Sequence, residues 1–354
     1  MKAMQIQDYG PATDLRLADA QQPSINEDQI LVQVGAAGVN PVEPYIRSGT
    51  NNYTASRFPH TPGSDGAGTV VALGDKVTGF EIGQRVYFSR NLTGSSAEYT
   101  VCAATHTYPL ADALSFEEGA CLGIPYTTAH RALFGRANAK TGDKVLVHGA
   151  TGAVGLATVQ LALAAGMEVT ASAGTTAGAE LLRQQGVTQV IMHNESDHLA
   201  PFQTLDKGFD IIIEMLANHN LDLDLKALTF GGCVAVVGNR GTVEINPRDL
   251  MARDASVVGV ALANTKPHEL ALIAKALRPL FEMGVLKPVI RHSYALTELA
   301  QANEDVLKSG AFGNLVVRIN AYPFFFYSLY KPRGSALLVI TRRCRENHLQ
   351  KRRY

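Results

Sequence analysis

The spacing of hydrophobic positions changes part-way along the chain. Up to about residue 123, short β-branched runs are separated by Gly, Pro, Asn and Asp, which is typical of strands and turns. Examples are Ile30–Val34, Gly68–Leu73 and Gln84–Phe88. From residue 144 to 262, apolar runs of strand length alternate with stretches of helical spacing. That alternation predicts an α/β fold with a doubly wound parallel sheet, covered by helices on both faces.

The bounds of these elements follow from the same pattern. Strands are expected at 144–148, 168–173, 209–214, 232–237 and 256–262, and helices at 154–165, 179–185 and 221–228. Ser115 with Glu118 three residues later resembles a capping box, so a helix should begin there. Further helical patterns occur at 126–134, 268–284 and 296–308, and a strand is expected at 314–318.

Composition narrows the class of protein. A chain of 354 residues with 46% hydrophobic residues is expected to fold into two domains, and it is too apolar to be disordered. Basic and acidic residues number 32 each, so no net charge attracts the whole chain to nucleic acid or an anionic membrane. The four cysteines lie far apart, and the first residues lack the apolar core of a signal peptide. No stretch reaches the roughly 20 apolar residues of a membrane span, and a cytosolic protein is expected.

The last 34 residues differ from the rest. Residues 321–354 hold eight basic residues and one acidic residue, together with an aromatic run at Tyr322–Tyr327. One hypothesis is an arm that binds a membrane surface or RNA. The other is a non-homologous end produced by alternative splicing or by an error in the gene model.

The strongest local motif is the glycine-rich segment Val145–Gly155. Ala150, Gly152 and Gly155 occupy the three positions of a Gly-x-Gly-x-x-Gly turn between a predicted strand and a predicted helix. Small residues let backbone N–H groups approach a pyrophosphate, and the start of the helix adds partial positive charge. The segment therefore predicts a dinucleotide site, against the alternative of an ordinary strand–helix turn.

The end of the second predicted strand indicates which dinucleotide binds. NAD sites carry Asp or Glu there to hold the ribose 2′-hydroxyl, whereas this chain has Ala171–Thr176 without an acid. A 2′-phosphate would be accepted by hydroxyls, by backbone N–H groups and by a nearby cation. Thr175, Arg183 or His193 can serve, so the sequence favours NADP (NADPH).

Five segments together resemble a known family. They are 41–49, 62–68, 148–155, 211–218 and 237–248. In these segments the chain is similar to the zeta-crystallins, the NADPH:quinone oxidoreductases that form a zinc-free branch of the medium-chain dehydrogenase/reductase superfamily. The resemblance extends over residues 1–319. It implies a GroES-like β-rich substrate domain (residues 1–123, completed by 263–320) and a Rossmann NADP-binding domain (residues 124–262), with 321–354 as an atypical tail.

The resemblance also implies the site residues. Cofactor contacts fall on Tyr45, Thr151, Gly152, Ala153, Val154, Gly174, His193, Asn220, Val237, Gly238, Asn239, Arg240, Val260, Ala261 and Leu262. Asn40 and Tyr45 are expected beside the acceptor carbonyl, with Thr128 near the nicotinamide. Tyr45 would donate a hydrogen bond or a proton, or else only pack on the cofactor as an aromatic of the rim.

A zinc site is not expected. Zinc-dependent relatives carry Cys and His where this chain has Asn40 and Ser64, and they also carry a four-cysteine loop that this chain lacks. Zinc needs about four N, S or O donors, so neither a catalytic nor a structural site can be assembled.

The expected function is therefore NADPH-dependent reduction of quinones by hydride or single-electron transfer, without metal or flavin. One alternative is reduction of enones or enals on the same fold. Another, implied by the resemblance alone, is a crystallin-type protein that binds AU-rich 3′-untranslated mRNA, with reductase activity as a secondary property. A homo-oligomer, either a dimer or a tetramer, is expected through the apolar strand at 256–262.

Overall fold

The parallel sheet expected in the middle of the chain is present in the computed structural model, which describes residues 1–50, 53–55, 57–308, 310 and 312–319. Within these residues its order is β10-β9-β8-β11-β12-β13, and each neighbouring pair is parallel. The chain order therefore reverses between β8 and β11, the place where such sheets bind ligands. The strands are β8 (Lys144–Val147), β9 (Glu168–Ala173), β10 (Gln189–Met192), β11 (Phe209–Glu214), β12 (Leu228–Val236) and β13 (Ser256–Gly259).

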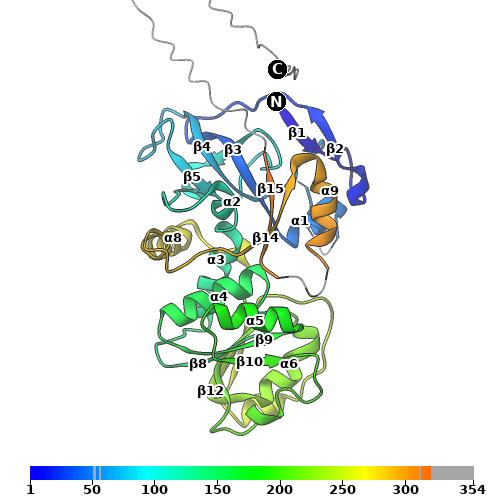
Figure 1. Cartoon of the computed structure of the whole chain (residues 1–354), viewed down its shortest axis with the longest axis vertical. Coiled ribbons are helices and arrows are strands. Elements are labelled where there is room, and N and C mark those ends of the chain that lie inside the picture. Colours follow the sequence, from blue (N-terminus) through cyan, green and yellow to red (C-terminus); the bar gives the residue numbers. More distant parts are fainter. Residues whose placement is uncertain (51–52, 56, 309, 311, 320–354) are drawn as a thin grey trace, which may run out of the picture. The chain divides into compact units, whose positions relative to one another are not determined.

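Helices cover both faces of this sheet because alternate side chains of each strand point to opposite faces. Val145 and Val147 of β8 pack in one core with Leu156 of α4, whereas Leu146 packs in another with Leu225 of α6. The helices of this part are α4 (Ala153–Ala164), α5 (Thr176–Gln184), α6 (Ala217–Lys226) and α7 (Pro247–Met251). The doubly wound arrangement expected from the alternating pattern is thus confirmed (Figure 1).

A second, mainly antiparallel sheet is formed by both ends of the described chain. Its order is β14-β15-β3-β4-β5-β7, with β6 also paired to β3. Because β15 pairs antiparallel with β3, a C-terminal segment completes a sheet that the N-terminal residues begin (Figure 1). The strands are β3 (Gln29–Val39), β4 (Asp65–Leu73), β5 (Arg85–Phe88), β6 (Tyr99–Ala103), β7 (Thr107–Pro109), β14 (Ile290–Ala295) and β15 (Asn314–Arg318), beside a separate hairpin of β1 (Lys2–Gln5) and β2 (Arg16–Asp19).

Five further α-helices complete the described part of the chain. They are α1 (Val42–Ser48), α2 (Phe116–Gly119), α3 (Gly123–His130), which continues into a wider π-helical turn at Arg131–Arg136, α8 (Pro267–Glu282) and α9 (Leu299–Asp305). The capping box expected at the start of α2 is confirmed, since Oγ of Ser115 accepts from the Glu118 N–H at 3.1 Å. The hydroxyl of Tyr126 on α3 donates to Gln160 on α4 at 2.7 Å.

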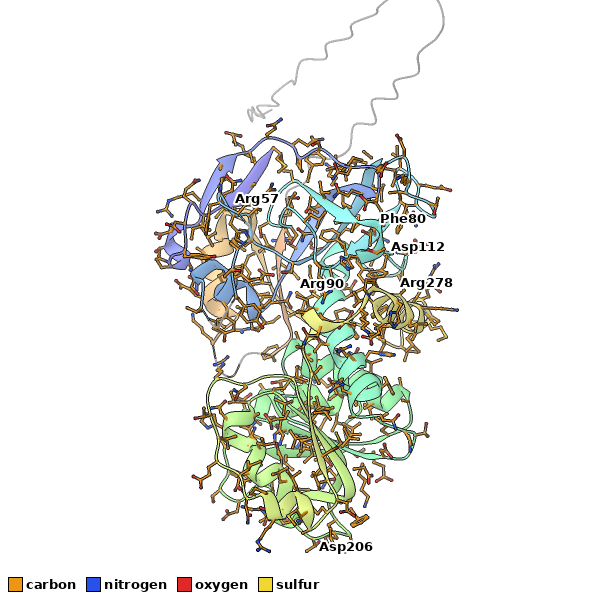
Figure 2. The ribbon with its side chains drawn as sticks, turned by 180° about the vertical axis from the view of Figure 1, so that it is seen from behind. Arg57, Phe80, Arg90, Asp112, Asp206 and Arg278 are labelled. Atoms are coloured by element: carbon orange, nitrogen blue, oxygen red, sulfur yellow. The ribbon has the colours of Figure 1, made fainter. Side chains whose placement is uncertain are left out.

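Two backbone contacts tie the sheets together next to the glycine-rich turn. The N–H of Gly313, just before β15, donates to the carbonyl of Thr151 at 2.7 Å, and Gly152 and Gly313 form an isolated parallel bridge. In addition, the guanidinium of Arg90, which Figure 2 labels, donates to the carbonyl of Leu262. The region of the second sheet is therefore bonded directly to segments expected to hold the cofactor.

Some expected bounds were wrong. The strand expected at 256–262 ends at Gly259, and α6 begins at Ala217 rather than at 221. The helix expected at 296–308 is α9, preceded by a 3₁₀ turn. The tail at 321–354 lies outside the described residues. Among the described helices, none combines the length and the apolar character needed to cross a bilayer.

Candidate functional site

The residues expected to hold a dinucleotide gather at one edge of the parallel sheet. The turn at 149–152 follows β8, Gly174 follows β9, His193 follows β10, the turn at 237–240 follows β12, and residues 260–262 follow β13. Carboxyl ends of parallel strands meet at the same edge, and that edge is where open α/β sheets bind ligands. The structure therefore brings together segments that are more than 100 residues apart in sequence.

Two positions of the glycine-rich turn, 149 and 155, require glycine. Gly152 is the N-cap of α4, and Gly149 has a φ of +53°, in the left-handed region that favours glycine. A side-chain carbon at Gly155 would lie 2.3 Å from the carbonyl oxygen of Gly149. Backbone N–H groups at the start of a twelve-residue helix thus lie at the sheet edge, and such groups favour an anion. A pyrophosphate fits this turn.

The next position along the edge is occupied by Gly174 and His193. A side-chain carbon at Gly174 would lie 2.7 Å from Nε2 of His193, so only glycine leaves the imidazole in place. Thr175 is the N-cap of α5, and its hydroxyl accepts from the Gly178 N–H at 3.0 Å. Arg183 lies instead in the last turn of α5, where it pairs with Glu180 at 3.8 Å. Of the groups considered for a 2′-phosphate, Thr175 and His193 lie at the sheet edge and Arg183 does not.

The segment after β12 is held by the backbone and the side chain of Asn218 on α6. The N–H of Asn218 donates to Oδ1 of Asn239 at 3.0 Å, and the N–H of Arg240 donates to Oδ1 of Asn218 at 2.9 Å. A side-chain carbon at Gly238 would lie 2.2 Å from the carbonyl of Met215. The amide nitrogen of Asn220, expected to contact the cofactor, donates inward to Glu214 at 3.2 Å.

One residue expected beside the acceptor, Asn40, contacts a buried carboxylate. Asn40, at the end of β3, donates through Nδ2 to Oδ2 of Asp65 at 3.1 Å. The same oxygen accepts from the N–H of Ile124 at 2.8 Å, in the first turn of α3. Thr128, which is buried, follows one turn later on α3. Asp65 thus links Asn40 to the helix that carries Thr128.

The interpretation of the sequence missed two carboxyl groups here. Asp65 and Glu43 are both buried, and the Ser64 N–H donates to Oε1 of Glu43 at 3.4 Å. Burial raises the pKa of Glu43 to about 8, and the nearby charge of Asp65 adds to that effect. Burial raises the pKa of Asp65 only to about 6, because the N–H of Ile124 and the amide of Asn40 stabilise its ionised form. The Gly63–Asp65 segment drew attention in the sequence because Ser64 stands where zinc enzymes carry a histidine, but nothing in the sequence showed that the Asp65 carboxylate is buried.

Tyr45 lies in α1, and its ring stacks with that of Tyr53 at a centroid distance of 6.1 Å. An aromatic pair of this kind is consistent with either role proposed for Tyr45, as a donor or as a packing surface.

A cavity of about 490 Å³ lies beside α1 and is lined by Glu43, Ile46, Ser64 and Asn91, among others.

A zinc ion does not fit the positions where zinc enzymes hold it. The amide nitrogen of Asn40 is directed to Asp65, and Ser64 offers only a hydroxyl. Zinc sites in proteins are built from thiolates, imidazoles and carboxylates, and neither an amide nor a hydroxyl provides an equivalent ligand. No step of a mechanism is therefore assigned to zinc.

Two family models match the chain. The family model "Alcohol dehydrogenase GroES-like domain" matches residues 26–120, and the model "Zinc-binding dehydrogenase" matches residues 153–277. The chain is 46% identical to the quinone oxidoreductase of Rattus norvegicus over 321 residues, which cover 90% of this chain and 97% of that protein. It is 44% identical to the quinone oxidoreductase of Homo sapiens over the same shares of the two chains.

A solved structure supports the same fold. A mycobacterial protein complexed with NADPH superposes with a TM-score of 0.81 at 26% identity, covering 90% of this chain and 100% of that one. The α/β fold expected from the sequence, with a GroES-like part and a Rossmann part, is confirmed.

Proposed function

Because the chain belongs to the quinone oxidoreductase family of the medium-chain dehydrogenase/reductase superfamily, we propose that it reduces quinones with NADPH. The observation that carries the proposal is the set of small-residue turns at one sheet edge, to which the region of the second sheet is bonded through Gly313 and Arg90. Reduction of a quinone to a hydroquinone takes up one hydride and one proton. A quinone is easily reduced, so the reaction needs no metal ion to polarise the carbonyl.

The cofactor would be held by backbone groups. The Thr151–Val154 turn would bind the pyrophosphate, and the turn at 237–240 and residues 260–262 would line the nicotinamide side. NADPH supplies the hydride when bound. Arg90 fixes the carbonyl of Leu262 and so orients the segment that would face the nicotinamide amide. The work of the protein is to orient the two reactants and to exclude water.

A preference for NADPH rests on the residues beside Gly174. Residues 171–176 carry no acid that would repel a 2′-phosphate, and His193 and the Thr175 hydroxyl lie at that position. Arg183 does not contribute to this preference, because it lies in the last turn of α5, away from the sheet edge. Fluorescence titrations with NADPH and NADH test the preference, and tighter binding of NADH would contradict it.

The acceptor would lie against Asn40, Tyr45 and Thr128. The Asn40 amide donates to Asp65 and also interacts with the Glu43 carboxyl group, so Asn40 would form a fixed polar side of the acceptor site. Negative charge develops on that carbonyl oxygen during reduction, and a hydroxyl donor such as Tyr45 would stabilise it.

Two matched substitutions separate the roles of Tyr45. If its hydroxyl donates to the acceptor, Tyr45→Phe lowers kcat by about 10–1000-fold, the range for one positioned donor or proton source. If it only packs on the cofactor, Tyr45→Phe is nearly silent and Tyr45→Ala weakens NADPH binding. Tyr53→Phe is the control, because Tyr53 stacks on the same ring and is not assigned to the reaction.

The reaction itself is tested by following NADPH oxidation with ortho-quinones, para-quinones, enones and simple ketones. We expect turnover of quinones, unchanged after dialysis against a strong chelator. Turnover of ethanol or of a simple ketone, with none of any quinone or enone, would overturn the proposal. Turnover of enones alone would favour the second function considered from the sequence.

We also propose that the chain self-associates through β13. This strand lies at the edge of the parallel sheet, and Val257 on it is exposed. An open apolar edge invites pairing with another strand. Sedimentation at micromolar concentration should show a dimer or tetramer, and a monomer alone would contradict this.

A further inference from the structure

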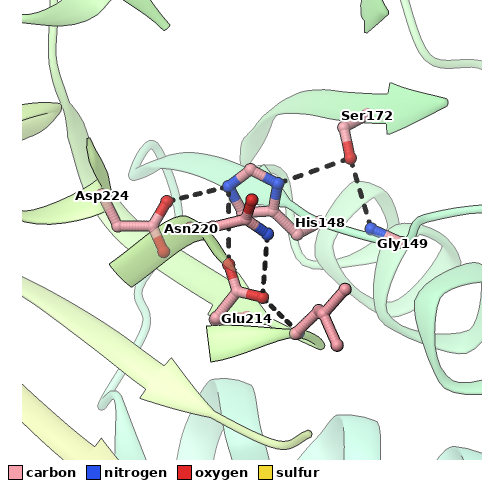
Figure 3. A network of polar contacts seen from close by, with 7 residues as sticks. His148, Gly149, Ser172, Glu214, Asn220 and Asp224 are labelled. Atoms are coloured by element: carbon pink, nitrogen blue, oxygen red, sulfur yellow. Dashed lines mark hydrogen bonds and ion pairs between the residues drawn. The ribbon is translucent and has the colours of Figure 1, made fainter. Parts of the chain in front are cut away.

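A buried polar cluster lies directly behind the glycine-rich turn. His148 follows β8 and precedes Gly149, the first residue of the turn (Figure 3). Ser172 comes from β9, Glu214 from the end of β11, and Asp224 from α6. All four side chains are almost completely buried, with at most 2% of each residue exposed. The proposed function uses none of these four side chains.

The contacts form one chain of hydrogen bonds with a consistent direction. The Gly149 N–H donates to Oγ of Ser172 at 3.2 Å, and the Ser172 hydroxyl lies 3.5 Å from Nδ1 of His148. Nε2 of His148 lies 2.9 Å from Oδ1 of Asp224. If the imidazole is neutral with its proton on Nε2, each donor along this chain meets an acceptor. Burial lowers the pKa of His148, which favours that neutral form.

The two carboxyl groups of the cluster require one proton between them. Oε1 of Glu214 accepts from the Leu216 N–H and from Asn220, but its Oε2 has no hydrogen-bond partner among the described residues. Oδ2 of Asp224 is likewise without a partner there. Burial raises the pKa of both groups to about 7. A proton on Glu214 Oε2, donated to Asp224, satisfies both oxygens and leaves a single negative charge facing His148.

Other titratable groups also face this cluster. His193, at the cofactor edge, has its pKa lowered by burial and by the nearby His148 and His198. The ring of His198 lies 6.5 Å from that of His148, and its Nδ1 contacts the carbonyl of Glu195 at 3.2 Å. Among the described residues, neither His193 nor His198 is hydrogen-bonded to Glu214 or Asp224. These two carboxyl groups are therefore the ones whose ionisation changes the charge behind the turn.

We propose that His148 is a positioning residue for NADPH binding: Glu214 and Asp224 share one proton, hold the neutral imidazole, and through Ser172 fix the N–H of Gly149 at the start of the dinucleotide turn. This inference rests on the proposed function, because it assigns the turn to NADPH. As the pH rises and the shared proton is lost, two adjacent buried carboxylates repel each other. The turn then loosens, and NADPH binds less tightly at alkaline pH.

The test is direct titration of NADPH binding by fluorescence between about pH 6 and pH 9, a range that spans the pKa of about 7 of both carboxyl groups. The 2′-phosphate, with a pKa near 6, ionises in the same way with the wild-type protein and with each variant, so the proteins are compared with one another at each pH. Glu214→Gln keeps the neutral donor toward Asp224 and cannot ionise. The Kd values of the two proteins should agree within about twofold at pH 6, and that of the wild-type protein should become about tenfold higher than that of Glu214→Gln by pH 9, the coupling that corresponds to one pKa unit.

Two further variants separate positioning from folding. Ser172→Ala removes the link between His148 and Gly149, and should weaken NADPH binding about threefold to tenfold at every pH, the effect of one hydrogen bond. Asp222→Asn is the matched control on α6, since Asp222 pairs with Lys226 at the surface and should leave the pH response unchanged. Thermal unfolding without cofactor confirms that each variant is folded.

The possible outcomes are distinct. A pH response in Glu214→Gln equal to that of the wild-type protein overturns the inference, and so does a stoichiometric divalent cation found by elemental analysis, which would neutralise the carboxylates without a proton. NADPH binding that is insensitive to Ser172→Ala overturns the positioning role. Failure to bind NADPH or NADH at any pH contradicts the proposed function, whereas binding without quinone turnover leaves the inference standing and rejects the reaction.

Discussion

Each of the two sheets has one pair of buried carboxyl groups nearby. The two pairs show how neighbouring hydrogen-bond donors decide which carboxyl group of a pair keeps a proton. Glu43 and Asp65 lie beside Asn40, and Glu214 and Asp224 lie beside His148. Burial raises the pKa of all four groups. In the first pair two N–H donors meet on one oxygen of Asp65, so Asp65 ionises first and Glu43 keeps its proton to about pH 8.

The second pair is more even. Glu214 accepts from a backbone N–H and from Asn220, while Asp224 accepts from the imidazole, and both have a pKa of about 7. Burial therefore moves carboxyl groups toward neutral pH, and the placement of donors decides which one ionises. In the first pair Glu43 holds the proton and Asp65 is ionised at neutral pH, whereas Glu214 and Asp224 share one proton.

The largest effect is expected from Glu43→Gln, which removes the most strongly shifted group. The folded protein keeps the Glu43 proton up to about pH 8, whereas unfolded glutamate releases it near 4.5. The wild-type protein therefore loses about 1.4 kcal/mol of unfolding free energy per pH unit relative to the variant, or about 4 kcal/mol between pH 5 and pH 8. Urea unfolding at several pH values measures this difference. Parallel curves for the two proteins would contradict the assignment of the proton to Glu43.

Asp65→Ala comes next, because it removes the acceptor on which the first pair depends. The Asn40 amide and the Ile124 N–H would remain buried without a partner. We expect a loss of about 3 kcal/mol in unfolding free energy, which urea denaturation measures. The exposed Asp112, labelled in Figure 2, offers the control Asp112→Ala. A loss below about 1 kcal/mol for Asp65→Ala would mean that Asn40 and α3 do not depend on this carboxylate.

A smaller effect is expected from Glu214→Gln on stability without cofactor. The raised pKa of about 7 means that the folded protein holds a proton that the unfolded chain releases near 4.5. Stability of the wild-type protein should fall relative to the variant by about 2 kcal/mol between pH 5.5 and pH 7, and level off above that range. If the unfolding free energy of the wild-type protein continued to fall relative to Glu214→Gln up to pH 8, as expected for Glu43, then Glu214 would hold its proton as strongly as Glu43 does. The proposed difference between the two pairs would then be wrong.

The smallest effect concerns His193, which lies next to the second pair but outside it. His193→Ala should weaken NADPH binding about threefold to tenfold by loss of one hydrogen bond to the phosphate, and should leave NADH binding unchanged. His268→Ala is the control, because His268 is exposed on α8. An equal loss of affinity for NADPH and NADH would show that His193 stabilises the site without binding the 2′-phosphate.

The sequence predicted best those strands whose two ends are marked by the residues of the run itself. β9, β11 and β15 begin and end where the apolar runs predicted, because each run is bounded by Gly, Ala or polar residues. β10 at the sheet edge and the β1–β2 hairpin were missed, since short and partly exposed strands lack a distinct pattern. The start of α6 was missed because Asn218, His219 and Asn220 favour helix weakly, and packing against the sheet overrides that preference.

Prediction of the candidate site divides in the same way. The turns that follow parallel strands could be placed from the strand–helix alternation, because topology brings those ends to one edge. The carboxyl pairs could not, because Glu214 approaches His148 across 66 residues of chain and Asp65 approaches Asn40 across 25. Burial of a carboxyl group is a property of the assembled core, so the raised pKa of Glu43 has no local signature in the sequence.

The bond between Gly313 and Thr151 has a mechanical consequence. β15 is fastened to β3 along its length, and the residue just before it is fastened to the dinucleotide turn. If a force pulls the chain at Arg318, β15 must separate from β3 before the load reaches Gly313, so the sheet shields the turn from tension. In a single-molecule stretching experiment, occupancy of the turn should raise the force of the second rupture and leave the first unchanged.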